Sequence, residues 1–376
     1  MPGRPLYVVN QMSSTPAHPA VRVPAGWLLA GTLVAIFVIV AVIDDGKGWN
    51  FWIEQARNGL TTGSLYALIA LGYTMVYGVL RMINFAHGEV FMIGAFAGWV
   101  VLTEVFGGDG MSDWLIAPAI VVAMLAAALA SASAVVVIER FAYRPLRHAP
   151  RLAPLISAIG VSIFLSNLFL RLTDARFKQY PRIFPQGPGE SIDLGFTDID
   201  YIQLFLVGSS IVMMLALFLF VQRTRMGTSI RAVAENQEVS SLMGINVNQV
   251  IVVTFVIGAA LAGVAGVMYG LWLYNIKGTM GFLPGIKAFT AAVLGGIGNV
   301  PGAMAGGFLI GLAESVGREQ LNTLFNPTLT WAFGWAGADG LGLGNEWKDV
   351  VAFFVLILVL LFRPTGIFGE VVGKRA

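Results

Sequence analysis

The chain has 376 residues, of which 57% are hydrophobic and only 12% are charged, and its mean hydropathy is +0.77. Soluble domains carry about 25% charged residues, so this chain has too few charges to cover a water-facing surface of its size. The net charge of +2 gives no reason to expect a nucleic-acid partner. The absence of cysteine excludes disulfides, thiolate metal sites and a cysteine nucleophile, and three histidines are too few for a histidine-rich metal site. We therefore expect a membrane protein without a metal site.

Apolar stretches of membrane-spanning length recur along the whole chain. A helix needs roughly 20 apolar residues to cross a bilayer core of about 30 Å. The pattern predicts an all-α polytopic membrane protein with about ten transmembrane or re-entrant helical segments, at 26–43, 59–80, 88–106, 114–138, 152–172, 201–221, 247–273, 284–298, 301–317 and 348–362. The segment 284–298 is short and ends in a glycine-rich turn, which is typical of a half-span that turns back inside the protein. We also expect an inverted structural repeat, although no direct sequence repeat is visible.

The two ends of the chain differ from the rest. Residues 1–25 contain several prolines and no periodicity, which indicates a disordered tail. The first span, 26–43, has an apolar run that is long for a signal peptide and lacks a cleavage pattern, so we expect it to stay as an anchor. One transmembrane domain is then expected over 26–370, followed by a short cytoplasmic tail at 371–376.

The positions of the basic residues predict the orientation in the membrane. Segments 139–151 and 222–231 and the carboxyl-terminal tail are rich in arginine and lysine, whereas the loop 107–113 has two aspartates and no base. Cytoplasmic loops carry an excess of lysine and arginine. The basic segments and both termini are therefore expected in the cytoplasm. The loop 173–200 contains basic residues but falls outside in this arrangement; it is also acidic and long, and such loops cross membranes regardless of charge.

A polar turn at 81–89 interrupts two strongly apolar segments. It contains Asn84, Phe85, His87, Gly88 and Glu89. Ionisable and amide side chains near membrane depth are costly and usually face a protein interior or a wet cavity. The functional interpretation is a turn that lines a transport pathway. The structural alternative is a short loop at the membrane surface, held by side-chain hydrogen bonds.

The nucleotide-binding P-loop is missing from the sequence. No segment matches G-x-x-x-x-G-K-[ST], because the only Gly-Lys pairs are followed by glycine and by arginine. The chain is therefore not expected to be an ATPase. If transport is driven by ATP, another subunit must bind the nucleotide.

A polar, helix-prone stretch at 226–245 lies between two spans on the basic side. Ile230, Val233, Ala234 and Gln237 fall on one face of a helix and form a partly apolar stripe. Gly244 is placed to end that helix in a left-handed conformation. An exposed stripe of this kind suits docking of a partner protein, and the alternative is an ordinary interfacial helix.

Glycines spaced four residues apart recur within the predicted spans. Small residues let membrane helices approach closely. The expected role is tight packing inside one chain, in preference to specific dimerisation. The pairs are Gly94 and Gly98, Gly266 and Gly270, Gly302 and Gly306, and Gly307 and Gly311.

Four ordered motifs together resemble the LivH-type permeases of branched-chain amino acid ABC transporters. They lie at 58–89, 231–245, 287–298 and 363–369, so the resemblance covers roughly residues 55–370. The second motif looks like the loop through which these permeases contact their ATPases, here spanning 222–246. The residues that the resemblance places in this coupling loop are Gly227, Arg231, Ala232, Ala234, Glu235, Asn236, Gly244 and Ile245.

The resemblance implies a permease subunit of a bacterial inner-membrane importer. Its partners would be a second, LivM-like permease subunit, two ATPase subunits and a periplasmic binding protein. ATP and magnesium would be bound by the ATPases, and this chain would need no cofactor. The cargo would be leucine, isoleucine or valine, and residues 84–89 would lie near its path.

Two alternatives remain open at the level of the sequence. Related permeases carry urea, short amides and other amino acids, and the shared motifs lie in scaffold and coupling regions. A stand-alone, ion-driven transporter is a different class, but the coupling-loop resemblance and the shortage of intramembrane acids argue against it. Glu89, Glu104 and Glu314 are the main candidates for such acids.

Overall fold

The computed structural model describes residues 48–147, 149–150, 152–184, 191–193, 198–333, 347–362 and 366–367. The expected tail 1–25, the expected span 26–43 and the tail 371–376 lie outside these residues. Within them the chain is mostly helical, as the hydropathy pattern predicts. The helices are α2 (Gly48–Leu80), α3 (His87–Val100), α4 (Asp113–Ile138), α5 (Leu152–Leu172), α6 (Tyr201–Arg223), α7 (Arg225–Glu235), α8 (Gln237–Leu242), α9 (Val247–Leu273), α10 (Phe282–Gly295), α11 (Val300–Phe333) and α12 (Trp347–Phe362).

Short irregular elements extend or connect these helices. Helix α3 runs into a π-helical turn at Val101–Val105, and α4 into another at Glu139–Tyr143. Short 3₁₀ turns follow at Gly108–Gly110 and Arg144–Leu146. Two antiparallel pairs of short strands complete the fold: β1 (Lys178–Gln179) with β4 (Asn275–Ile276), and β2 (Ser191–Asp193) with β3 (Asp198–Asp200).

Seven helices in the described part of the chain are long and apolar enough to cross a membrane. They correspond to the expected segments from 59–80 to 247–273 and to 301–317. Helix α10 has 14 residues, a length of about 21 Å at 1.5 Å per residue. That is shorter than the bilayer core, which agrees with the short segment expected at 284–298.

Two boundaries differ from the hydropathy pattern. Helix α2 begins at Gly48, where the apolar run suggested 59, and α11 continues to Phe333, where it suggested 317. Hydropathy reports only the apolar portion of a helix. The first turns of α2 contain Glu54 and Arg57, which can form helix without lying in hydrocarbon.

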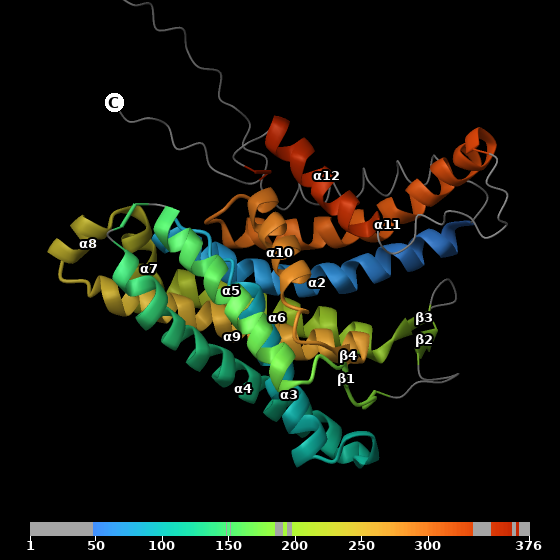
Figure 1. The fold of residues 1–376 in the computed structure, drawn as a ribbon, viewed down its shortest axis with the longest axis horizontal. Coiled ribbons are helices and arrows are strands. Elements are labelled where there is room, and N and C mark those ends of the chain that lie inside the picture. Colours follow the sequence, from blue (N-terminus) through green and yellow to red (C-terminus); the bar gives the residue numbers. More distant parts are fainter. Residues whose placement is uncertain are drawn as a thin grey trace, which may run out of the picture.

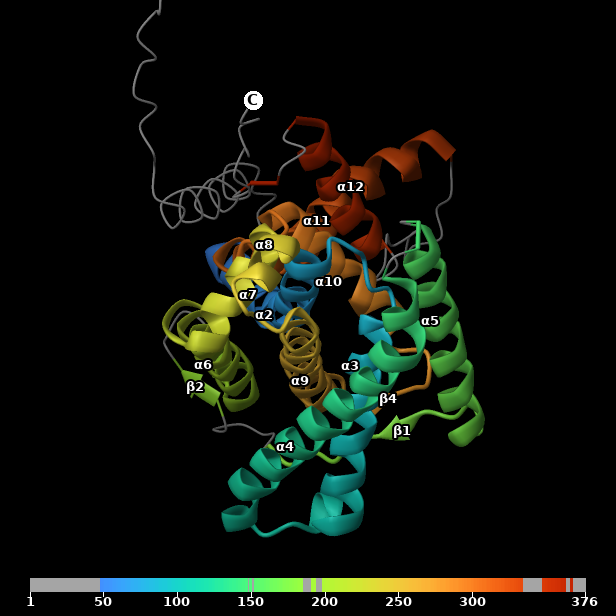
Figure 2. The ribbon, with the colours of Figure 1, turned by 90° about the vertical axis from the view of Figure 1, so that its left-hand side faces the viewer.

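Helix α2 lies at the centre of the molecule. Figure 2 shows α2 and α9 in the middle, α6 on one side, α3 and α5 on the other, α4 below and α10 to α12 above. All residues from Leu65 to Leu71 are fully or almost fully buried. The helix therefore forms the axis around which the others pack.

Glycines allow these helices to touch backbone to backbone. A Cβ added to Gly94 of α3 would lie 2.2 Å from the Cα of Gly263 in α9. One added to Gly307 of α11 would lie 2.4 Å from the Cα of Ala67 in α2. The expected packing inside one chain is thus observed for these pairs of helices.

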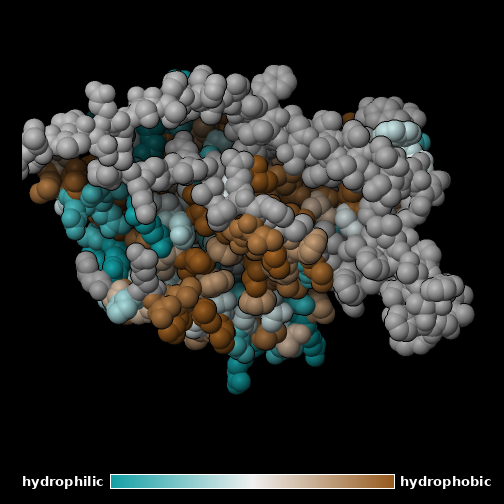
Figure 3. Space-filling model, turned by 90° about the horizontal axis from the view of Figure 1, so that it is seen from above, coloured by the Kyte–Doolittle hydropathy of each residue, from teal (hydrophilic) through white to brown (hydrophobic). Residues whose placement is uncertain are grey.

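The outer helices expose apolar side chains, as a lipid-facing surface requires. Exposed residues include Val121, Leu125 and Leu129 of α4, Ile156 and Ile163 of α5, and Val212 and Leu215 of α6. Figure 3 shows hydrophobic residues across the middle of one face, with hydrophilic residues gathered toward the end that carries α7 and α8.

The loops gather at two ends of the bundle. At the end that carries α7 and α8, Arg147 donates to the Asn248 side chain at 2.6 Å, so the basic segment 139–147 meets the start of α9. At the other end, the backbone N–H of Arg182 donates to Asp109 at 2.6 Å, and Trp99 donates to the carbonyl of Gln179 at 2.8 Å. Segments expected on the same side of the membrane thus lie together (Figure 1).

Candidate functional site

In the turn at 81–89, Asn84 and the residues from Ala86 to Glu89 are buried inside the bundle, whereas Arg81 is exposed and Met82 and Ile83 are half-buried. Arg81 adopts a left-handed conformation with φ of 52°, which ends α2, and His87 starts α3 after a short irregular stretch. Asn84 is 2% exposed. Its Oδ1 accepts from the backbone N–H of Ala86 at 3.1 Å and from the hydroxyl of Tyr143 at 2.5 Å. One amide oxygen therefore fixes the turn and ties it to the end of α4.

The other polar residues of this turn contact neighbouring helices. The ring of His87 stands edge-on to Tyr73, with centroids 4.7 Å apart, and packs against Gly72. Gly88 lies against the backbone of Gly281, where a Cβ would meet the carbonyl oxygen at 2.3 Å. Glu89 accepts from the hydroxyl of Ser162 in α5 at 3.2 Å. Glu89 therefore links two helices and does not hold the turn itself.

The side of the turn that faces open space consists of other residues. A cavity of about 830 Å³ is lined by Arg81, Met82 and Ile83, together with Arg147 and Gln237. Phe85 is half-buried and stacks obliquely with Phe289 of α10. Asn84, His87 and Glu89 do not line this cavity, so the residues singled out from sequence lie behind its wall.

Arg147 at the rim of this cavity pairs with a buried carboxylate. Its guanidinium forms an ion pair with Glu139, which is 2% exposed. Burial lowers the pKa of Arg147, and the neighbouring Glu139 charge opposes that shift. The pair anchors the segment after α4 to the bundle.

The predicted coupling segment forms two helices where the sequence suggested one. Asn236 has an extended backbone, with φ of −153°, and its Oδ1 accepts from the N–H of Val239 at 3.0 Å. Asparagine is a strong N-cap, so it starts α8 instead of continuing α7. Thr224 caps α7 in the same way, accepting from the N–H of Gly227 at 3.0 Å.

The prediction that the apolar stripe of α7 faces outward was wrong. Ile230 and Val233 are 4% and 1% exposed, because α7 turns this face onto the bundle. The exposed apolar residues are on α8 and just after it: Val239, Leu242 and Met243, at 54%, 88% and 78%. The interpretation of a docking surface therefore moves from α7 to α8.

The remaining residues of the predicted coupling loop are spread around these two helices. Gly227 is buried against the carbonyl groups of Phe220 and Val221. Arg231 and Glu235 are exposed, Ala232 and Ala234 are half-buried, and Ile245 packs at the edge of the core. Gly244 has φ of 82°, so it ends α8 in the left-handed conformation that was predicted.

One side chain of α8 connects this segment to the centre of the bundle. The amide of Gln237 donates to the carbonyl of Val79 in the last turn of α2, at 2.8 Å. That carbonyl belongs to the helix end next to the turn at 81–89. The coupling segment and the turn, predicted separately, are thus neighbours in space.

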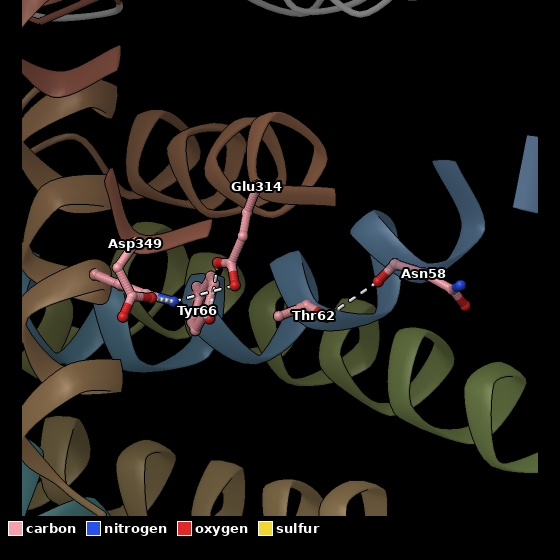
Figure 4. Close-up of polar contacts among 6 residues, drawn as sticks. Asn58, Thr62, Tyr66, Glu314 and Asp349 are labelled. Carbon is pink, nitrogen blue, oxygen red and sulfur yellow. Dashed lines mark hydrogen bonds and ion pairs between the residues drawn. The ribbon is translucent and has the colours of Figure 1, made fainter. Parts of the chain in front are cut away.

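A buried ionic cluster joins four helices and was not predicted as a site. Lys287 of α10 pairs with Glu314 of α11 at 3.1 Å and also with Asp349 of α12. The hydroxyl of Tyr66 in α2 donates to Glu314 at 3.0 Å. Figure 4 shows Glu314 and Asp349 pointing toward Tyr66 from their two helices. Lysine and glutamate within apolar segments were the available signal, but only the fold shows that they meet.

A second cavity, of about 370 Å³, lies next to this cluster at the end away from α8. It is bounded by α2, α6, the end of α9 and α11. Asn58, Thr62 and Tyr66 follow one another along α2 and lead from the cavity to the cluster (Figure 4). Nothing in the sequence pattern pointed to this cavity, because its lining comes from four distant segments.

Two motifs of the sequence resemblance also meet. The backbone N–H of Ile367 donates to the carbonyl of Leu294 at 2.8 Å, and Gly366 lies against Gly296 with φ of 81°. Residues 366–367 therefore pack on the end of α10. In the part of the chain that the structure describes, no three acidic or histidine side chains converge as a metal site.

In the part of the chain that the structure describes, a bundle with seven possible spans, two cavities between its helices and an exposed helix at one end defines a polytopic membrane protein. Residues 55–360 match the family model described as branched-chain amino acid transport system / permease component. The chain belongs to this family.

Three relatives show how far the similarity extends. The permease protein BraD of the high-affinity branched-chain amino acid transport system of Pseudomonas aeruginosa is 47% identical over 324 residues, covering 85% of this chain and 96% of the relative. The corresponding LivH of Escherichia coli K12 is 43% identical with the same coverage. The ribose import permease RbsC of Escherichia coli K12 is 25% identical over 354 residues, covering 89% of this chain and 94% of the relative.

Proposed function

We propose that this chain is an inner-membrane permease subunit of an ATP-driven importer for branched-chain amino acids: leucine, isoleucine and valine. The observation that carries the proposal is the similarity to BraD and LivH across almost their whole length. In this proposal a periplasmic binding protein delivers the cargo. A LivM-like second permease completes the pathway, and two ATPase subunits bind ATP and magnesium. This chain needs no cofactor of its own.

The orientation follows from the charges and from the two ends of the bundle. The basic segments 139–147 and 222–231 lie at the end that carries α8, so we assign this end to the cytoplasm. The loops 107–113 and 173–184 then face the periplasm. Both termini are assigned to the cytoplasm with ten segments, and because this requires an even number of crossings, the short helix α10 counts as one of them. An inverted repeat belongs to the same proposal.

We propose that the ATPases dock on α8 and that Gln237 passes their movement to α2. Leu242 and Met243 are the most exposed apolar side chains of the segment and lie at the end we assign to the cytoplasm. Large apolar residues in such a place suit a protein interface. Gly227, Arg231 and Asn236 hold the two helices in position beneath that interface. The turn at 81–89 lies next in line and borders the larger cavity, through which the cargo would leave.

The test uses the whole importer reconstituted in lipid vesicles, with labelled leucine as the cargo. We expect uptake that requires ATP and the binding protein. Replacing both apolar tips, Leu242→Gln with Met243→Gln, should abolish uptake and release the ATPases during purification. The control is Val105→Gln at the opposite end, which removes a residue of 67% exposure. Normal uptake and normal ATPase retention in the double variant would reject the docking role.

The same vesicles decide the cargo. Excess leucine, isoleucine or valine should compete with labelled leucine, whereas urea, a short amide or ribose should not. If only urea or an amide competes, the cargo belongs to the alternative class of urea and short amides. Uptake driven by an ion gradient without ATP would contradict the importer proposal altogether.

A further inference from the structure

The smaller cavity has the size and place of a binding site for a small polar molecule. Its volume of about 370 Å³ lies within the range of about 300–1,000 Å³ that is usual for small-molecule pockets. It opens at the end that we assign to the periplasm, between the first turns of α2, the start of α6 and the middle of α11. A molecule released outside the membrane would meet this cavity before the rest of the bundle.

Acidic side chains outnumber basic side chains among the residues that line the cavity. Glu54, Asp200 and Glu314 bring three carboxylates, of which Glu314 is paired with Lys287 of the ionic cluster, and Arg57 brings the one guanidinium among the lining residues. Such a cavity attracts a cationic group and offers one place for an anionic group. The Nε of Arg57 is buried without a hydrogen-bond partner, although its Nη2 lies 3.7 Å from Glu54.

Gln203 of α6 supplies an acceptor that the fold leaves unused. Its side chain is 3% exposed and its Nε2 donates to Asn58 at 3.0 Å, which fixes the orientation of the amide. The Oε1 of the same amide is buried without a hydrogen-bond partner, and Gln203 lines the cavity. A buried acceptor without a donor is unfavourable, so its retention suits a ligand that donates hydrogen bonds.

We propose that this cavity binds the α-ammonium and α-carboxylate groups that all free amino acids share. Gln203 Oε1 accepts from the ammonium group, which the surrounding carboxylates favour, and Arg57 donates to the carboxylate. Trp272 at the end of α9 gives an apolar wall for an aliphatic side chain. This inference rests on the proposed function and locates the first contact of the cargo with the permease.

The complete lack of cysteine allows a direct test by protection from a thiol reagent. Ser315→Cys places a thiol in the cavity wall, Thr62→Cys is a second reporter, and Ser209→Cys is a control on α6 outside the cavity. The full complex is reconstituted without ATP, and a membrane-impermeant methanethiosulfonate is added from the periplasmic side. Leucine should slow the labelling of both cavity reporters and leave Ser209→Cys unchanged.

Two analogues of leucine identify which group is recognised. We expect 4-methylpentanoate, which lacks the ammonium, and 3-methylbutylamine, which lacks the carboxylate, to protect much less than leucine. In the Ser315→Cys background, Gln203→Leu should raise the leucine concentration for half-protection by about tenfold, the effect of one lost hydrogen bond to a charged group. Ser210→Ala is the matched control, because it removes another buried, unpartnered oxygen of α6 that does not line the cavity. Arg57→Gln should weaken protection by leucine and leave protection by the amine unchanged.

The outcomes separate this inference from the proposed function. If the complex imports leucine while leucine protects neither reporter, or if neither reporter reacts at all, the inference is overturned and the function stands. Equal protection by leucine and both analogues, or an unchanged half-protection in Gln203→Leu, also overturns it. A complex that does not import leucine under any condition overturns the function instead.

Discussion

Asn84 shows how much one buried amide can determine. Its Oδ1 accepts from a backbone N–H inside the turn and from the Tyr143 hydroxyl at the end of α4. Glu89, five residues later, is equally buried, but it accepts a hydrogen bond from Ser162 on another helix. The two residues therefore stabilise different parts of the molecule, although both belong to one short polar segment.

We predict that Asn84→Leu disables transport and that Glu89→Gln retains much of it. The leucine leaves the Ala86 N–H and the Tyr143 hydroxyl without an acceptor, at about 1–3 kcal/mol for each buried group. The glutamine keeps an oxygen that accepts from Ser162. The measurement is leucine uptake in vesicles, with assembly of the complex checked by co-purification. Loss of uptake in an assembled Glu89→Gln complex, with normal uptake in Asn84→Leu, would assign a charge-dependent role to Glu89.

Single residues were predictable only where the signal is local. The left-handed Gly244 and the buried polar character of 84–89 follow from nearby sequence, and the structure has both. The partners of Lys287 do not, because Tyr66 lies 221 residues away and Glu314 lies 27 away. A lysine in an apolar segment indicates that some partner exists, but the fold must supply its identity.

At the scale of helices, the pattern of hydropathy was sufficient for the order of the apolar helices within the described residues, seven of which are long enough to cross a membrane. It failed at the start of α2 and at the end of α11, where helix continues beyond the apolar run. It also missed the break at Asn236, because a cap competes with helix continuation over one residue while periodicity averages over many. The hydropathy pattern could not predict the two cavities, since each lies between helices that are distant in sequence.

Close packing of α2 on α11 gives a prediction at this scale. Gly307→Ala should prevent stable assembly, because the new methyl group would lie 2.4 Å from the Cα of Ala67, where backbone cannot yield. Overpacking typically costs about 1–3 kcal/mol, and contact with backbone places this case at the upper end. Gly160→Ala in α5 is the control, since nothing lies within 4 Å of its added Cβ. Thermal stability in lipid nanodiscs measures both, and equal midpoints would contradict the close contact.

For the whole molecule, the orientation can be tested with two single cysteines. Ser112→Cys and Ser241→Cys are both exposed and lie at opposite ends of the bundle. An impermeant thiol reagent outside intact spheroplasts should label Ser112→Cys at once and Ser241→Cys only after the membrane is opened. The reverse pattern would invert the assignment of the basic end to the cytoplasm and remove α8 as an ATPase contact.

Because α2 runs through the centre of the bundle, a tilt of this helix at one end displaces its other end. Its Val79 carbonyl is held by Gln237 of α8, and its Asn58 is held by Gln203 at the smaller cavity. At 1.5 Å per residue these two points lie about 32 Å apart on one helix. A tilt of about 5° about the first point moves the second by about 3 Å, the size of a hydrogen bond. A small tilt of α2 at the end that contacts α8 is therefore large enough to make or break the contacts of a small molecule in the smaller cavity.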